Sequence, residues 1–264
     1  MSFFTANTIS AGYAGRTIVD HVSFSLEGGS LMGVLGANGC GKTTLIKALC
    51  SILPHTGSCR LQGHALEALS PRQVAQLCSY IPQRSGISID MPVLDVVLMG
   101  FNPQLRLLDR PSAAMQRAAL DALRCVGLAG MEHKNHLHLS EGQKQLCILA
   151  RTLVSGAKLF LLDEPESALD FHFRYTMLDV LAARLKAQQC SAIVALHDPL
   201  LALNYCDSLL LLHEGRMLDI LFPAKDPLPR MEAALSRLYG SVSLHQMQSR
   251  SGRTQLVMLR EDCP

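Results

Sequence analysis

Gly36-Ala37-Asn38-Gly39-Cys40-Gly41-Lys42-Thr43-Thr44 lies between an apolar run, residues 31–35, and a helix-like stretch, residues 45–49. This order predicts a strand, a loop and the start of a helix, whose unpaired N–H groups and positive dipole end attract an anion. Lys42 adds a cation that can reach terminal phosphates, and the Thr43 hydroxyl is suited to a magnesium ion. The stretch therefore predicts a cradle for the phosphates of a nucleotide.

The composition of the chain limits the class of protein. It has 264 residues, 48% hydrophobic and 17% charged, which predicts a globular protein with a large core. The net charge of +2 is too small to predict a strongly basic nucleic-acid binder. Nine cysteines form no C-x-x-C pair, so we expect free thiols in a reducing, cytoplasmic compartment. No signal-peptide pattern is evident, and no apolar run approaches the ~20 residues that span a bilayer.

Strand-like segments lie on both sides of the cradle. Residues 2–9 and 22–26 favour strands, with Tyr13 in a predicted loop between them, from which its ring could stack on an adenine base. A half-buried loop tyrosine is the alternative. Residues 79–83 predict a buried strand that ends at Gln83, whose side chain could reach a magnesium ion or its water, although a solvent-facing glutamine is commoner.

Residues 92–139 change to helical patterns poor in strand formers, which predicts a helical subdomain inserted into an α/β body. Ser140 then resembles the N-cap of a helix whose start could bind a second anion; a purely structural cap is an equal alternative. The nearby His133, His136 and His138 could ligate a metal. No cysteine or carboxylate set accompanies them at zinc spacing, so exposed loop histidines are favoured.

Two acidic residues follow a continuous apolar run, residues 159–162, the pattern of a parallel strand buried on both faces. Ligands of open α/β sheets bind beyond the carboxyl ends of the strands, so we expect Asp163 on the magnesium side of the cradle and Glu164 facing an attacking water. Surface turn acids are the alternative. A second such strand, residues 190–196, precedes His197, which could contact a terminal phosphate but could also be structural.

Taken in order, these residues resemble the ATP-binding-cassette (ABC) ATPases over residues 2 to about 222. The resemblance implies an α/β fold, a P-loop NTPase with a RecA-like core, an antiparallel β subdomain and an inserted α-helical subdomain. It implies an ATPase domain at residues 2–240, with the helical subdomain at about 92–155. Residues 241–264 would be a short C-terminal extension that could form a hairpin.

The resemblance also implies roles for individual residues. Tyr13 would stack on adenine, Glu164 would be catalytic, and His197 would brace the γ-phosphate. Two copies of the chain would form a homodimer around two ATP molecules, in which Ser140 and Gly142 act in trans. The residues implied to bind ATP or act in hydrolysis are Tyr13, Gly36, Asn38, Gly39, Cys40, Gly41, Lys42, Thr43, Thr44, Gln83, Ser140, Gly142, Gln143, Glu164, Asp170 and His197. Those implied to hold Mg²⁺ are Thr43, Gln83 and Asp163.

Two acidic residues depart from the family pattern. Glu141 stands where glycine is most frequent in the family signature, and Glu166 stands where threonine is usual. Each adds a negative charge close to a triphosphate, which would oppose nucleotide binding if it pointed inward. We therefore expect both side chains to point away.

Residues 93–103 and 196–207 resemble the ATPases of importers for iron-siderophores, haem, cobalamin and related metal chelates, with departures at Phe101, Gln104 and Pro199. This implies a peripheral subunit at the cytoplasmic face of the inner membrane, working with an integral-membrane permease and an extracytoplasmic substrate-binding protein, and no nucleic acid. The alternatives are an ATPase of a free zinc or manganese importer and, less favoured, one acting on nucleic acid or ribosomes. The single cassette without a heptad run disfavours the last. A non-hydrolytic module would be expected to lack Glu164 or Lys42.

Overall fold

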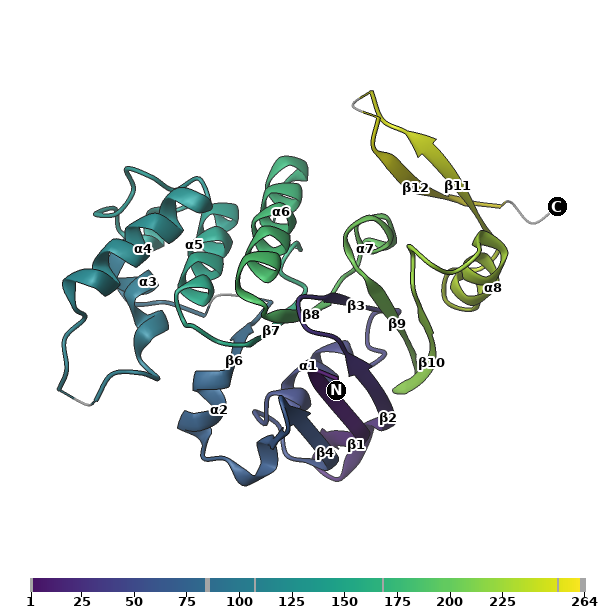
Figure 1. Cartoon of the computed structure of the whole chain (residues 1–264), viewed down its shortest axis with the longest axis horizontal. Helices are drawn as coiled ribbons and strands as arrows, with labels where there is room; N and C mark the ends of the chain where they lie inside the picture. Colours follow the sequence, from purple (N-terminus) through teal and green to yellow (C-terminus); the bar gives the residue numbers. More distant parts are fainter. Residues whose placement is uncertain (1, 84–85, 107, 168, 251, 262–264) are drawn as a thin grey trace.

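The computed structural model describes residues 2–83, 86–106, 108–167, 169–250 and 252–261. Part of the expected C-terminal extension, residues 262–264, lies outside the described residues. Figure 1 shows three regions along the chain: N-terminal strands, a group of helices at one end, and a central sheet between them, with a hairpin close to the C-terminus.

A six-stranded sheet of order β10-β9-β3-β8-β7-β6 forms the centre. Neighbouring strands are parallel from β9 to β6, and only β10 is antiparallel to its neighbour. The strands are β3 (Leu31–Leu35), β6 (Cys78–Ile81), β7 (Leu159–Asp163), β8 (Ser191–Ala195), β9 (Ser208–His213) and β10 (Arg216–Leu221). β3, β7 and β8 are buried at every position, as expected of strands covered on both faces. Their parallel direction brings the residues that follow β3, β6, β7 and β8 to one edge.

The N-terminal strands form a separate antiparallel sheet of order β2-β1-β4-β5. Its members are β1 (Phe4–Tyr13), β2 (Arg16–Leu26), β4 (His55–Leu61) and β5 (His64–Ala65), and helix α1 (Lys42–Leu49) packs in a core shared with the central sheet. β5 is too short to pair with all of β4. The Glu67 carboxylate, in the 3-10 turn Leu66–Ala68, instead accepts the Cys59 N–H at 2.5 Å and so satisfies a backbone donor at this edge.

Helix α2 (Pro71–Leu77) packs in the same core as α1, and the remaining helices pack in a second core with the central sheet. These are α3 (Val93–Leu98), α4 (Ala113–Cys125), α5 (Glu141–Leu153), α6 (Phe171–Gln188), α7 (Pro199–Tyr205) and α8 (Leu228–Tyr239), with 3-10 turns Met99–Phe101 and His136–His138. Figure 1 shows α3, α4 and α5 gathered together, away from the N-terminal strands. The apolar faces of these three helices join the core of the central sheet.

The histidine group before α5 only partly follows the sequence expectation. His133 and His138 are exposed, whereas His136 is fully buried in its 3-10 turn, and neither of its ring nitrogens has a hydrogen-bond partner among the described residues. Burial lowers the pKa of His136, which favours the neutral imidazole. The expectation of an exposed loop residue is wrong for His136, because this turn packs against the helical core.

The chain ends in a hairpin of β11 (Val242–Gln248) and β12 (Thr254–Arg260). Figure 1 shows it projecting beside α8. Asn204, near the end of α7, holds β12: its Nδ2 donates to the Leu256 carbonyl at 2.9 Å and its Oδ1 accepts the Leu256 N–H at 2.9 Å. The asparagine side chain thus takes the place of a neighbouring strand.

The eight cysteines that the structure describes are free thiols, and only Cys125 among them is exposed. Within the described part of the chain, no helix combines the length and apolarity required to cross a membrane.

Candidate functional site

The loop between β3 and α1 curls around the Lys42 ammonium group. Its backbone takes positive φ angles at Gly39 (79°) and Gly41 (109°), which a side chain would strain. The side chain of Lys42 is 3% exposed, and its Nζ donates to the carbonyls of Gly36 at 2.9 Å and Ala37 at 3.3 Å. The loop, Lys42 and the start of α1 thus have the arrangement that the predicted anion cradle requires.

Glu164 is the centre of the charged cluster beside this cradle. Its Oε1 lies 3.4 Å from Lys42 Nζ, and its Oε2 lies 2.6 Å from His197 Nε2 and accepts Gln83 Nε2 at 2.8 Å. The Glu164 side chain is 11% exposed, and its backbone has a strained φ of 49°. The four residues predicted for catalysis thus meet, although they follow four different strands.

Asp163, the last residue of β7, lies beside Thr43. The Thr43 hydroxyl donates to Asp163 Oδ1 at 2.9 Å, and the Tyr80 hydroxyl makes a longer contact of 3.4 Å to Oδ2. Burial raises the pKa of Asp163, and the hydrogen bond from Thr43 opposes that shift. A hydroxyl and a carboxylate are hard oxygen ligands of the kind that Mg²⁺ prefers. This contact of Tyr80 was not predicted from the sequence. The feature that could have indicated it is a tyrosine in β6, the strand next to β7.

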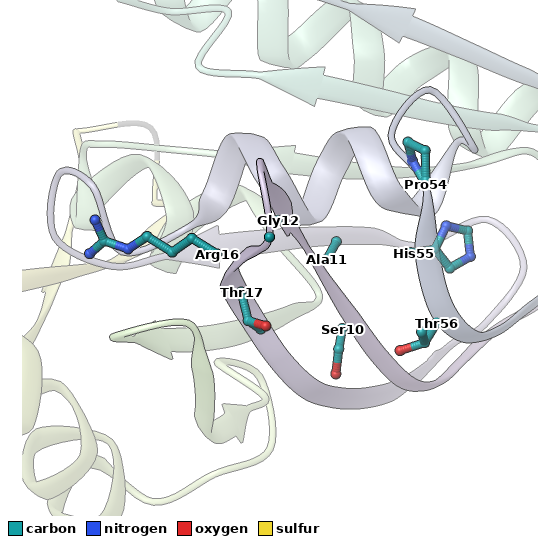
Figure 2. A pocket seen from close by; sticks show the side chains of 9 residues that line it. Ser10, Ala11, Gly12, Arg16, Thr17, Pro54, His55 and Thr56 are labelled. Atoms are coloured by element: carbon teal, nitrogen blue, oxygen red, sulfur yellow. The ribbon is translucent and has the colours of Figure 1, made fainter.

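Tyr13 ends β1 instead of lying in a loop, because β1 and β2 continue into a tight hairpin. The residue is 46% exposed, so part of it is accessible from solvent. A hollow of about 370 Å³ lies on the N-terminal sheet (Figure 2), lined by residues of β1, β2, the turn between them and the start of β4, including Gly12 and Gly15 on either side of Tyr13. None of its lining residues belongs to the cradle.

The second predicted anion site begins α5. Ser140 and Gln143 form a reciprocal capping box, with Ser140 Oγ accepting the Gln143 N–H at 3.2 Å and Gln143 Oε1 accepting the Ser140 N–H at 3.1 Å. Gly142 faces Leu169, and Asp170 caps α6 through the Phe173 N–H. In the described ranges, no hydrogen bond or ion pair joins these residues to the cradle.

The comparison with family models decides the family. Residues 19–167 match the model described as ABC transporter. The chain belongs to the ABC transporter family. It is an ATP-binding ABC ATPase with a P-loop NTPase fold.

Relatives and a solved structure extend this match. The chain is 36% identical to the hemin import ATP-binding protein HmuV of Enterobacter cloacae, over 82% of this chain and 83% of that protein. It is 32% identical to a Helicobacter pylori protein named as an iron chelatin transport ATP-binding protein, over 88% of this chain and 90% of that one. An inward-facing structure described as a metal-chelate type ABC transporter matches with a TM-score of 0.82 at 25% identity, covering 99% of both chains.

The two acidic departures from the ABC pattern lie in different surroundings. The Glu141 side chain is 72% exposed and pairs with Lys144 at 2.7 Å, as expected of a group that points away. Glu166 differs from the expectation: it is 1% exposed, and its Oε1 accepts the His197 N–H at 2.8 Å. Its carboxyl contacts His197, because the His197 N–H lies beyond the end of β8 and needs an acceptor.

Replacing Glu141 with glycine is expected to change ATP affinity and turnover by no more than about twofold, because its ion pair is solvent-exposed. Nucleotide titration and an ATPase assay measure both quantities. Glu141→Gln is the matched variant that removes the charge without adding backbone freedom. A large gain in ATP affinity in either variant would show that the charge reaches the nucleotide.

Proposed function

We propose that this ATPase powers an importer of a metal chelate such as an iron-siderophore, haem or cobalamin. The printed names of the Enterobacter and Helicobacter relatives and the description of the solved neighbour support this cargo class. A membrane permease and an extracytoplasmic substrate-binding protein complete the complex. The chain is a peripheral subunit at the cytoplasmic face of the inner membrane.

The convergence of Lys42, Gln83 and His197 on Glu164 is the observation that carries the hydrolytic assignment. Glu164 polarises the attacking water and accepts its proton, while His197 braces the γ-phosphate. Lys42 neutralises charge on the β- and γ-phosphates, and Tyr13 stacks on adenine. The rest of the cradle surrounds the phosphates: Gly36, Asn38, Gly39, Cys40, Gly41, Thr43 and Thr44.

Thr43, Asp163 and Gln83 hold Mg²⁺ in this proposal. The hydrogen bond between Thr43 and Asp163 supports it, because it places two oxygens of the kind that Mg²⁺ prefers 2.9 Å apart beside the cradle. Gln83 has its amide nitrogen on Glu164, and its oxygen is the ligand atom it can offer. When bound, the ion supplies positive charge to the phosphate oxygens.

Two copies of the chain work as a homodimer. The support is that, in the described ranges, no hydrogen bond or ion pair joins the start of α5 to the cradle of its own chain. A helix start suited to an anion can therefore bind the nucleotide of the other copy. The residues concerned are Ser140, Gly142, Gln143 and Asp170. In this organisation residues 2–240 form the ATPase domain, residues 92–155 its helical subdomain, and residues 241–264 an extension.

The test is capture followed by reconstitution. Tagged Glu164→Gln protein with ATP is used to recover its partner from detergent-solubilised native membranes. Vesicles are then prepared with the recovered permease, the wild-type chain and the extracytoplasmic substrate-binding protein of the same complex. Uptake of ferric siderophore, haem, cobalamin and free Zn²⁺ is measured. ATP-dependent uptake of one chelate supports the proposal. Uptake of Zn²⁺ alone, or recovery of ribosomes without a membrane protein, would overturn the chelate assignment and leave the ATPase intact.

A further inference from the structure

Glu166 is a buried acid that the roles above do not use. It lies on the loop after β7, two residues beyond Glu164, and is 1% exposed. Its Oε1 accepts the His197 N–H at 2.8 Å. Its Oε2 is also buried and has no hydrogen-bond partner among the described residues.

The bond to His197 joins two loops of the site. The preceding residue, Leu196, still donates its N–H to Val34 on β3, but the His197 N–H lies beyond the end of β8 and bonds to Glu166. An N–H without an acceptor at this part-buried position would cost free energy, and the Glu166 carboxyl supplies the acceptor. The same residue, His197, points its ring at Glu164, with 2.6 Å between Nε2 and Oε2. Fixing the backbone of His197 therefore fixes the imidazole.

We propose that Glu166 is a positioning residue for ATP hydrolysis, which holds the His197 backbone so that the imidazole faces Glu164 and the γ-phosphate. This inference rests on the roles given to Glu164 and His197 under Proposed function. It also accounts for an acid so close to a triphosphate: the carboxyl is turned to the His197 backbone, and burial raises its pKa and so favours its neutral form.

The charge of Glu166 gives the proposal a pH signature. The titratable groups that face it are Glu164 at the end of β7, His197 after β8 and the Cys206 thiol after α7. Burial, and secondarily Glu164, raise the pKa of Glu166, while the hydrogen bond from His197 lowers it; the net direction is upward. The neutral acid is therefore favoured at low pH. Ionisation at higher pH puts an unpaired charge beside Glu164 and the incoming triphosphate.

The experiment compares Glu166→Gln and Glu166→Leu in the full-length chain, alone or with its permease. Glutamine keeps an oxygen for the His197 N–H and cannot ionise; leucine has a similar volume and no acceptor. We expect wild-type kcat to fall as the pH rises through the raised pKa of Glu166, and E166Q to retain turnover without this fall. We expect E166L to lower kcat about ten- to a hundredfold with little change in KM, since a small displacement of a reacting group has effects of that size.

A double variant separates positioning from general damage. E166L combined with His197→Ala is expected to be no slower than His197→Ala alone, because Glu166 acts through the imidazole that His197→Ala removes. Glu67→Leu is the matched control: Glu67 also accepts a backbone N–H, from Cys59, but lies outside the site. It is expected to lower the Tm without altering the pH profile of kcat.

Wild-type kcat in E166L would overturn the proposal, as would the same fall of kcat with rising pH in E166Q as in the wild type. The E166Q profile decides the matter if E166L does not fold. If His197→Ala itself hydrolyses ATP at the wild-type rate, the role given to His197 has failed. If His197→Ala loses activity and E166L does not, the positioning role of Glu166 is rejected and the role of His197 stands.

Discussion

Glu164→Gln is expected to slow ATP hydrolysis at least about a hundredfold while leaving ATP binding intact, because an amide cannot accept the proton of the attacking water. The substitution keeps the shape of the side chain. It removes a negative charge that lies 3.4 Å from Lys42, so repulsion of the triphosphate falls and ATP affinity is equal or higher. Bound ATP that is not hydrolysed is expected to hold two chains together.

Single-turnover hydrolysis, nucleotide titration and light scattering with ATP measure these three effects. Glu67→Gln is the matched control, since it makes the same carboxylate-to-amide change at a hydrogen-bonded residue outside the site. Near-normal turnover in Glu164→Gln would remove Glu164 from its role. Lost turnover together with lost ATP binding would mean that the change had damaged the cradle.

Gly36→Ala is expected to have the second large effect, on both ATP affinity and stability. A Cβ at position 36 would lie 2.3 Å from the Leu212 carbonyl oxygen on β9 and 2.5 Å from Cys40 Sγ. The backbone oxygen cannot move without displacing a central strand, so the loop must shift and its N–H groups lose the phosphates. Overpacking of this kind costs about 1–3 kcal/mol.

Thermal unfolding without nucleotide gives the stability change, and titration with ATP gives the affinity. We expect a lower Tm and at least about a tenfold weaker affinity, since each lost hydrogen bond to a charged group is worth about 1.5–3 kcal/mol. Gly28→Ala is the control, because a Cβ there would meet only the Phe3 side chain, at 3.4 Å. Wild-type ATP affinity in Gly36→Ala would show that the phosphates do not depend on this loop geometry.

The fold could be predicted where local pattern and burial agree. The continuous apolar runs became β7 and β8 at the centre of a parallel sheet, and Ser140 caps α5 as its position suggested. Parallel order alone then brings the ends of β3, β6, β7 and β8 to one edge, so the meeting of Lys42, Gln83, Glu164 and His197 was open to prediction.

Contacts that depend on side-chain direction across elements could not be predicted. Glu166 was expected to point away from the site, because its charge would repel a nucleotide. The sequence does not show that the His197 N–H lies beyond the end of β8 and takes Glu166 as its acceptor. Tyr80 reaches Asp163 from a neighbouring strand, and no spacing within β6 indicates that contact. His136 is buried by packing between segments distant in sequence, which its polar neighbours in the chain conceal.

The attachment of the C-terminal hairpin has a mechanical consequence. α7 begins at Pro199, two residues after His197, and Asn204 near its other end grips Leu256 of β12 through both amide atoms. A helix of this length is a stiff rod of about 10 Å. The helix therefore joins the hairpin to the segment that begins at His197, and we expect a displacement of β12 to be transmitted along α7 to the His197 backbone.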